Sequence, residues 1–415
     1  MQCKMFSFSW SKALAIFIAA LMLGAVASAA TEKVLYSFGN GSDAAYPFDT
    51  PVFDAAGNLY GTTWEGGTAN HGTVFELSPN GSGWTETVLY SFQGGPTDGG
   101  KASGSLIFDA SGNIYGTTRD GGSTACSSCG TVFKLTPANG TWTETILYAF
   151  AGGKDGEYPY AGVIMDAAGN LYGMTNRGGT HHVGTVFELS PSNGGWTKTT
   201  ILNFSGLNGN GPVAGLTLDA KGNLYGTTQS GGTAKLGVVF ELSPGKHGWK
   251  ETVLHSFTGG SSDGSGPGAN VIFDTAGNLY GTTYAGGSGA CTNGCGTVFE
   301  LSPSSGGWTE TIIQSLSDLG QNRPNNIVFD ASGNLYGTTR RGGTGKQCTG
   351  GGCGTVFELT PANGTWTETV LYSFRGIPDG AVPFSGPIVD AKGNVYGTTV
   401  FGGKYHPGVM YEIVP

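Results

Sequence analysis

One motif recurs seven times along this chain, and it limits the possible folds more than any other feature. The motif is Asp-x-x-Gly-Asn-(Leu/Ile/Val)-Tyr-Gly, and successive copies lie 53–60 residues apart. Its aspartates are Asp54, Asp109, Asp166, Asp219, Asp274, Asp330 and Asp390. A repeat of this length is typical of propellers, solenoids and other arrays in which one supersecondary unit is copied.

Each repeat predicts four short strands, which we name A to D in chain order. In the first copy they span residues 51–54, 58–63, 73–78 and 85–92. β-branched and aromatic residues fill these runs, and Gly, Asn, Pro and Ser separate them, as in strands joined by turns. The chain holds 76 Gly, but they fall at fixed places between apolar runs and so indicate turns rather than disorder. Seven four-stranded antiparallel units predict an all-β, seven-bladed β-propeller.

The two ends of the repeat array complement each other. Residues 34–38 match strand D with no strand A, B or C before them, and residues 409–414 match strand C with no strand D after them. We therefore expect the N-terminal strand to join three C-terminal strands in the last blade, a 1+3 closure. Such a closure would remove an open strand edge and so protect the ring against aggregation.

Residues 1–30 have the features of a secretory signal peptide. Lys4 and Lys12 precede an apolar run over residues 13–26, and Ala27-Ser28-Ala29 then supplies small residues at a cleavage site. The run is too short to predict a membrane anchor. We expect a secreted, periplasmic or cell-surface protein whose propeller spans residues 31–415 in repeats of about 55 residues.

Charge excludes two classes of partner. The formal net charge is −9, and removal of Lys4 and Lys12 makes the chain more acidic still. An acidic surface repels phosphate backbones and anionic lipids, so nucleic acid is not an expected partner. No second long apolar segment follows, so no membrane insertion is expected after cleavage, and we expect a monomer.

Two blocks in each repeat carry a resemblance to a known family. They are Gly-Asn-Leu-Tyr-Gly-Thr-Thr-x-x-Gly-Gly at residues 57–67 and Gly-Thr-Val-Phe-Glu-Leu-Ser-Pro at residues 72–79. Over residues 32–415 the chain resembles the GloVer, or choice-of-anchor, tandem-repeat family of exported bacterial proteins. The repeat is also similar, more distantly, to kelch and NHL-type blades. The resemblance implies a β-propeller-like fold and no particular activity.

The connections between strands differ in length and variability. The A–B and C–D turns are short and nearly the same in every copy, whereas the B–C and D–A segments are longer and vary. In an up-and-down blade the B–C and D–A segments share one face. Because recognition usually lies on variable loops above a repeated scaffold, we expect the functional site on that face.

Arginine and irregular aromatic residues support this choice of face. All six arginines lie in B–C or D–A segments, and Trp64 and Tyr284 take the place of Arg119 and Arg340 in their own copies. Arginine binds carboxylate, sulfate or phosphate with two parallel hydrogen bonds. The alternative is that these arginines pair with loop acids such as Asp120 or Asp155. The predicted ligand-binding set is Tyr46, Trp64, Arg119, Tyr158, Arg177, Tyr284, Arg323, Arg340, Arg341 and Arg375.

Six cysteines outside the signal peptide form three close pairs, all in B–C segments. Paired cysteines in an exported chain favour local disulfides, although four of them on neighbouring blades leave a zinc site as an alternative. The predicted disulfides are Cys126–Cys129, Cys291–Cys295 and Cys348–Cys353. We predict no metal site and no cofactor, with calcium in a ring of D–A Asp-Gly turns left as an alternative.

Three functional hypotheses remain. The leading one is a non-catalytic exported propeller that binds a ligand, such as an acidic glycan or a cell-envelope protein, on the B–C/D–A face. The second is an enzyme, a lyase or hydrolase acting on a polysaccharide or lactone at the same place. The third is a structural surface protein. No nucleophile elbow, phosphate-binding loop or His-Glu-x-x-His motif is present to decide for catalysis.

Overall fold

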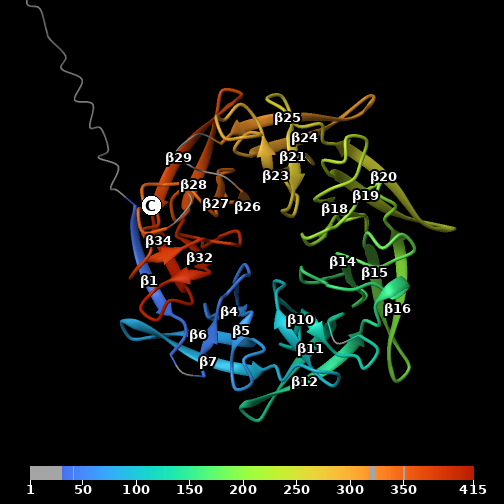
Figure 1. Ribbon diagram of the computed structural model, residues 1–415, viewed down its shortest axis with the longest axis vertical. Helices are drawn as coiled ribbons and strands as arrows, with labels where there is room; N and C mark the ends of the chain where they lie inside the picture. Colours follow the sequence, from blue (N-terminus) through green and yellow to red (C-terminus); the bar gives the residue numbers. More distant parts are fainter. Residues whose placement is uncertain (1–29, 41, 127, 317–322, 349–350) are drawn as a thin grey trace, which may run out of the picture.

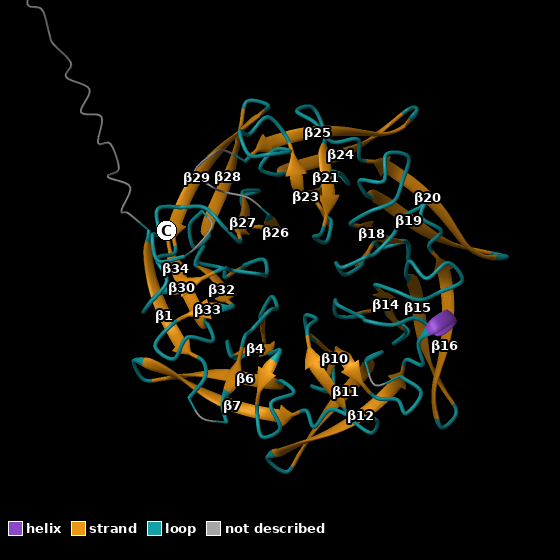
Figure 2. Cartoon of the chain, in the orientation of Figure 1, coloured by secondary structure: helices purple, strands orange, loops and turns teal. Residues whose placement is uncertain are grey.

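The computed structural model describes residues 30–40, 42–126, 128–316, 323–348 and 351–415. The predicted signal peptide lies outside them, except for Ala30. Seven β-sheets surround a common axis like the blades of a propeller (Figure 1), and loops connect their strands (Figure 2). The predicted all-β, seven-bladed β-propeller is thereby confirmed.

Each blade is an antiparallel sheet in which the strands are arranged in the order A, B, C, D, with strand A nearest the axis and strand D outermost (Figure 1). Blade 1 comprises β3 (Val52–Phe53), β4 (Leu59–Thr62), β6 (Thr73–Asn80) and β7 (Gly83–Ser91). Blade 2 comprises β9 (Ile107–Phe108), β10 (Ile114–Gly121), β11 (Thr131–Ala138) and β12 (Thr141–Ala149). Blade 3 comprises β13 (Ile164–Met165), β14 (Leu171–Thr175), β15 (Thr185–Ser192) and β16 (Gly195–Asn203). Blade 4 comprises β17 (Thr217–Leu218), β18 (Leu224–Thr228), β19 (Val238–Gly245) and β20 (Gly248–Ser256). Blade 5 comprises β22 (Ile272–Phe273), β23 (Leu279–Gly286), β24 (Thr297–Ser304) and β25 (Gly307–Ser315). Blade 6 comprises β26 (Pro324–Phe329), β27 (Leu335–Thr339), β28 (Thr355–Ala362) and β29 (Thr365–Ser373).

Blade 7 is built from both ends of the repeat array. It comprises β31 (Ile388–Val389), β32 (Val395–Thr399), β34 (Val409–Val414) and, as its outer strand, β1 (Thr31–Ser37). Strand β1 pairs antiparallel with β34, from Thr31 opposite Val414 to Ser37 opposite Val409. The predicted 1+3 closure is present.

The sequence did not predict the short strands in the variable segments. In blades 1, 2, 5 and 7 the D–A segment pairs with the start of the B–C segment, and two isolated bridges do the same in blades 3 and 4. The additional strands are β2 (Ala44–Ala45), β5 (Glu65–Gly66), β8 (Gly99–Ala102), β21 (Gly264–Pro267), β30 (Gly380–Ala381) and β33 (Phe401–Gly402). These Gly-rich runs lack the apolar alternation by which a strand is recognised. The backbone hydrogen bonds of these short strands attach the D–A segments to the B–C segments and so hold the variable loops in place.

Within the described residues, one short 3-10 helix, Gly153–Asp155, interrupts the all-β architecture. No described helix has the length and hydrophobicity to cross a membrane.

Each blade packs a fully buried ring on a glycine of the neighbouring strand. Phe75 on β6 lies opposite Gly61 on β4, where an added Cβ would be 2.7 Å from Phe75 Cζ. The ring of Phe75 also packs against Phe38 of β1's blade, with centroids 5.0 Å apart. Such ring pairs recur between successive blades, for example Phe92 with Phe133 at 5.2 Å. Aromatic burial between blades therefore holds the ring together.

The seven motif aspartates form the A–B turns. Asp54 Oδ1 accepts the backbone N–H groups of Ala56 and Asn58, and Oδ2 accepts hydrogen bonds from Asn58 Nδ2 and the Tyr60 hydroxyl. All seven copies repeat the bonds to the backbone and to Asn. These carboxylates belong to the scaffold, as Asx-type turns do.

Candidate functional site

A cavity of about 970 Å³ lies where the D–A segments of all seven blades converge. Its wall includes Phe48 of blade 1, Ser105 of blade 2, Tyr160 of blade 3, Asn270 of blade 5 and Asn325 of blade 6. The first residues of several B–C segments complete the rim. The cavity is therefore on the B–C/D–A face, where the sequence predicted the functional site.

The cavity brings together half of the predicted ligand-binding set. The predicted residues that line it are Trp64, Tyr284, Arg323, Arg340 and Arg341. The predicted residues that lie outside its lining are Tyr46, Arg119, Tyr158, Arg177 and Arg375.

Arg340 is the most enclosed of the lining arginines. Its Nε donates to Asn325 Oδ1 at 2.8 Å, and its Nη2 donates to the Tyr284 hydroxyl at 2.9 Å. The guanidinium carbon lies 3.4 Å from the ring centroid of Phe384. Burial lowers the pKa of this guanidinium, and neighbouring Arg323 acts in the same direction, while Tyr284 opposes it. Among the described residues, no carboxylate forms an ion pair with Arg340.

Arg119 occupies the same repeat position but has an acidic partner. Its Nη1 lies 3.1 Å from Asp120 Oδ1, and its Nε donates to the Tyr160 hydroxyl at 3.1 Å. The guanidinium also stacks 4.8 Å from the ring centroid of Tyr158. The difference comes from the next residue, which is Asp120 after Arg119 but Arg341 after Arg340. The alternative of pairing with a loop acid thus describes Arg119, whereas Asp155 pairs with Lys198.

The other predicted residues outside the lining make local contacts. Arg177 lies 5.7 Å from the ring centroid of Tyr158, and Tyr46 packs edge-on against Phe401. Arg375 borders a second cavity of about 500 Å³ between the outer strands of blades 6 and 7. These four side chains therefore lie outside the lining of the axial cavity.

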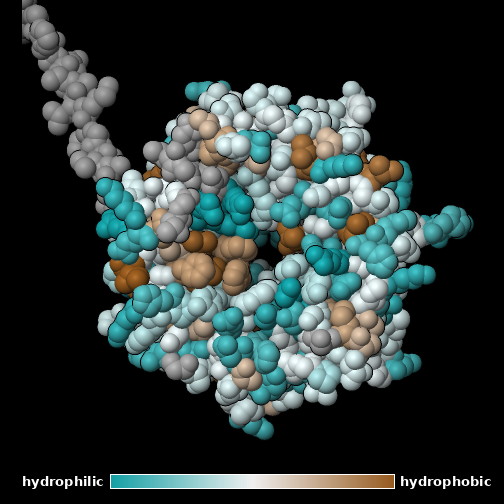
Figure 3. Space-filling view, in the orientation of Figure 1, coloured by the Kyte–Doolittle hydropathy of each residue, from teal (hydrophilic) through white to brown (hydrophobic). Residues whose placement is uncertain are grey.

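An aromatic cluster forms one side of the cavity. Phe48 lies between Trp64 and Phe384, with centroid distances of 5.3 and 4.8 Å. Hydrophobic side chains accordingly gather beside the central opening, next to the blade that holds β32 (Figure 3). The guanidinium of Arg340 contacts this cluster through Phe384. A ligand here would meet flat apolar surfaces and a cation together.

Sequence reasoning missed Asp49, the single acidic residue among those that line the cavity. Its Oδ1 accepts hydrogen bonds from the Thr50 backbone N–H and Ser105 Oγ, both at 2.9 Å, and its Oδ2 lies 3.3 Å from Thr62 Oγ1. Asp49 is only 9% exposed, and burial raises the pKa of its carboxyl to about 7, against the lowering effect of these hydrogen bonds.

A comparison of the repeats would have found Asp49. The residue five places before each turn aspartate is otherwise uncharged: Gly104, Ala161, Ala214, Ala269, Asn325 and Ser385. The backbone at this place belongs to the scaffold, because threonines of preceding blades bond its carbonyl, as Thr398 does for Asp49 at 3.1 Å. The carboxyl group is the feature specific to blade 1.

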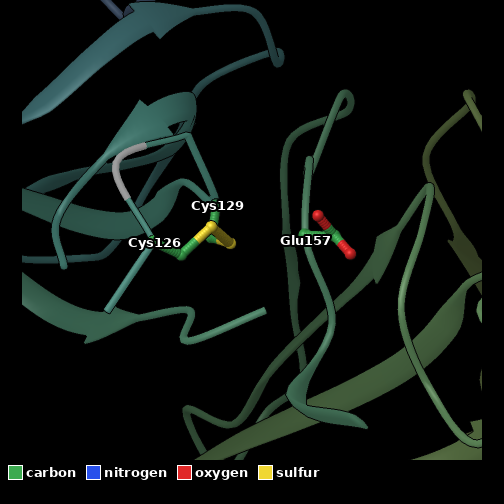
Figure 4. A group of neighbouring side chains, drawn as sticks. All are labelled: Cys126, Cys129 and Glu157. Atoms are coloured by element: carbon green, nitrogen blue, oxygen red, sulfur yellow. A yellow bond between two sulfur atoms is a disulfide. The ribbon is translucent and has the colours of Figure 1, made fainter. Parts of the chain in front are cut away.

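The three predicted disulfides are all formed: Cys126–Cys129, Cys291–Cys295 and Cys348–Cys353. Glu157 lies across from the first of them on a neighbouring segment (Figure 4). Because both sulfurs are bonded to each other, they are not available as thiolate ligands, and these three residues do not form a metal site. The disulfides also exclude the alternative of a four-cysteine zinc site.

Two solved structures with TM-scores of at least 0.50 support the fold. A protein from Lactobacillus plantarum is 15% identical with a TM-score of 0.52, over 86% of this chain and 99% of that chain. A putative 6-phosphogluconolactonase from Bacteroides uniformis is 16% identical with a TM-score of 0.50, over 86% and 98%. A gluconolactonase from Xanthomonas campestris is 14% identical with a TM-score of 0.43, over 75% and 86%. No curated protein sequence matches the chain.

Comparison with protein families matches the model of the Gloeobacter/Verrucomicrobia repeat to residues 25–220 and 194–411. These two matches cover nearly all of the repeat array, in agreement with the resemblance seen in the sequence motifs. The chain therefore belongs to the Gloeobacter/Verrucomicrobia repeat family.

Proposed function

We propose that this protein is exported and that its axial cavity binds a saccharide carrying a carboxylate or sulfate group. The observation that carries the proposal is the position of Arg340, an enclosed cation on the cavity wall with no acidic partner among the described residues. The three disulfides support export, because such bonds persist in oxidising compartments.

The hydrogen bonds of Arg340 leave room for an anion. A guanidinium has five N–H donors, and the described contacts use two of them, to Asn325 and Tyr284. A cation removed from water without an opposite charge is costly, and an anionic ligand offsets that cost. Carboxylate and sulfate match the planar, forked geometry of guanidinium.

The rest of the cavity suits a sugar. Phe48, Trp64 and Phe384 offer flat faces, while Asn270, Ser105 and backbone groups offer hydrogen bonds. The volume of about 970 Å³ is at the upper end of the range for small-molecule sites, about 300–1,000 Å³. The net charge of −9 disfavours long polyanions, so we expect an acidic group at the end of a chain or a short oligosaccharide.

A glycan array tests the proposal with the chain from residue 31 to 415. We expect binding to one class of acidic glycan, and we expect Arg340→Gln to weaken it by about 10- to 100-fold, as loss of a charge-assisted pair does. Arg177→Gln is the matched control, because Arg177 is exposed and lies outside the lining. Binding that Arg340→Gln and Arg177→Gln reduce equally, or the absence of binding to any acidic glycan, would contradict the proposal.

A second candidate function is catalysis on the same ligand, and Asp49 is the observation that favours it. A general acid or base works best when its pKa is near the operating pH, and burial brings Asp49 to about 7. Product analysis by mass spectrometry after incubation with each bound glycan tests this candidate. Turnover of the glycan that Asp49→Asn abolishes, while binding persists, would establish that the protein is an enzyme. Intact glycan in every incubation would leave binding as the function.

A further inference from the structure

The junctions between blades contain a recurring polar cluster at their outer edge. In it, the D–A segment that links two successive blades places an aspartate between the outer strands of those two blades. At the junction of blades 1 and 2, Tyr90 on β7 donates to Asp98 at 3.2 Å, and Glu144 on β12 faces the same aspartate. The equivalent tyrosines at three further junctions are Tyr36, Tyr148 and Tyr372.

The junction of blades 4 and 5 differs because a histidine replaces the tyrosine. His255 Nε2 on β20 lies 3.2 Å from Asp263 Oδ1, and Glu310 on β25 completes the cluster. One ligand atom from each of the three residues lies within 4.8 Å of the others. Tyrosine is a poor metal ligand at neutral pH, whereas imidazole nitrogen and carboxylate oxygen are common ligands of zinc.

The scaffold holds the Asp263 carboxylate in place. The Thr258 backbone N–H and hydroxyl donate to Asp263 Oδ2, at 2.6 and 2.7 Å, and the Gly264 N–H donates to Oδ1 at 2.6 Å. The buried Oε1 of Glu310 has no hydrogen-bond partner among the described residues, and the same holds for the equivalent Glu32, Glu144, Glu251 and Glu368, so what distinguishes this junction is the added imidazole. A buried carboxylate oxygen without a partner is costly, and a coordinated cation would satisfy it.

Another junction shows that this gap accepts positive charge. At the junction of blades 2 and 3, Lys198 replaces the glutamate, and its Nζ lies 2.8 Å from Asp155 Oδ1. The lysine side chain is only 5% exposed, so its ammonium group fills the interior of the cluster. At the junction of blades 4 and 5, no lysine or arginine of the described residues forms an ion pair with Asp263 or Glu310.

We propose that His255, Asp263 and Glu310 bind a Zn²⁺ ion between blades 4 and 5, at a site separate from the axial cavity. Ligand atoms about 2.0–2.2 Å from a tetrahedral zinc lie roughly 3.3 Å apart, which fits the 3.2 Å between Nε2 and Oδ1. Calcium prefers six to eight oxygen ligands and suits this set less well. The side chain of His255 is 22% exposed, so solvent can reach the site and supply the fourth ligand.

Calorimetric titration of the chelator-treated chain with ZnCl₂ tests the proposal. The variant His181→Ala/His182→Ala serves as the parent, so that these two adjacent exposed histidines cannot contribute to zinc binding. We expect one Zn²⁺ per chain and a higher melting temperature when zinc is present. In this parent, His255→Tyr should weaken binding by more than about 100-fold, because one of three ligands is lost.

The repeats provide the folding control for this substitution. His255→Tyr installs the residue that four other junctions contain, so the variant should melt like the metal-free parent. Glu310→Gln should also abolish the response to zinc. In the reverse experiment, Tyr90→His should create a second site with Asp98 and Glu144 and raise the stoichiometry to two.

Retention of one tight zinc in His255→Tyr, or a parent that neither binds Zn²⁺ nor gains stability from it, would overturn the proposal. Because each of these variants lies outside the axial cavity, glycan binding should persist in all of them. Failure of the zinc site would therefore leave the proposed function untouched.

Discussion

Gly61 and Phe75 show how a single residue decides the packing of a blade. A Cβ at position 61 would lie 2.7 Å from Phe75 Cζ, and the Phe75 ring is fully buried. Gly61→Ala should therefore lower the free energy of unfolding by about 1–3 kcal/mol through overpacking. Denaturant unfolding measures the change. Gly195→Ala is the control, because nothing lies within 4 Å of its Cβ, and equal effects of the two substitutions would contradict this account.

Single residues could be assigned from the sequence where neighbouring residues determine their role, and not where contacts between blades determine it. The turn aspartates and the disulfides were predicted, because their chemistry depends on nearby residues in the sequence. Asp49 was missed because only its carboxyl group distinguishes it from the six residues at the same repeat position. Arg340 and Arg119 share a repeat position as well, and only their contacts in the fold, with Asn325 and with Asp120, distinguish them. The burial and pairing of such residues arise from contacts between blades, such as those of Asp49 with Ser105 and of Arg340 with Tyr284, each pair 56 residues apart in the sequence.

At the scale of elements, the outer strands carry glutamates that face loop aspartates of the preceding blade. Burial, followed by the opposing aspartate, raises the pKa of Glu32 and of Glu144 to about 7, and also raises that of Glu86, which faces Asp43. The charged and titratable groups that interact electrostatically with Glu32 are Asp379, Arg375 and Tyr372, and those that interact with Glu144 are Asp98 and Tyr90. In these junctions the folded chain binds protons more tightly than the unfolded chain.

Stability should therefore fall as the pH rises. The contribution of these glutamates is complete below their ordinary pKa of about 4.5 and is lost as the pH passes through the raised values, so the melting temperature should fall from pH 5 to pH 9. Glu144→Gln should recover about 1–2 kcal/mol at pH 9, after allowance for partial exposure. Thermal melts across this range, with Glu65→Gln as a control outside the junctions, measure it. A flat or rising profile would rule out this account.

The elements themselves were predictable to within a few residues, but these junctions were not. Strand C was expected over residues 73–78 and extends to Asn80 as β6, because the hairpin with β7 continues to its tip. Apolar alternation reveals such strands. The facing of Glu144 and Asp98 depends on how two blades are positioned, and no local pattern encodes that arrangement.

At the scale of the whole molecule, β1 joins the two ends of the ring, and it does so in two ways. It supplies the backbone partner of β34, and Phe38 just after it packs on Phe75 of blade 1. Loss of this strand exposes the edge of β34 and opens the contact between blades 7 and 1. An exposed edge invites pairing with another chain.

Deletion of residues 31–38 should therefore lower the melting temperature strongly and produce oligomers, which calorimetry and size-exclusion chromatography detect. A less severe variant separates the two contributions. Phe38→Ala keeps the strand pairing but removes a fully buried ring, which should cost about 3–5 kcal/mol without exposing the edge. We expect this variant to be destabilised and still monomeric. A deletion variant that melts like the full chain and remains monomeric would show that the ring is held closed without β1.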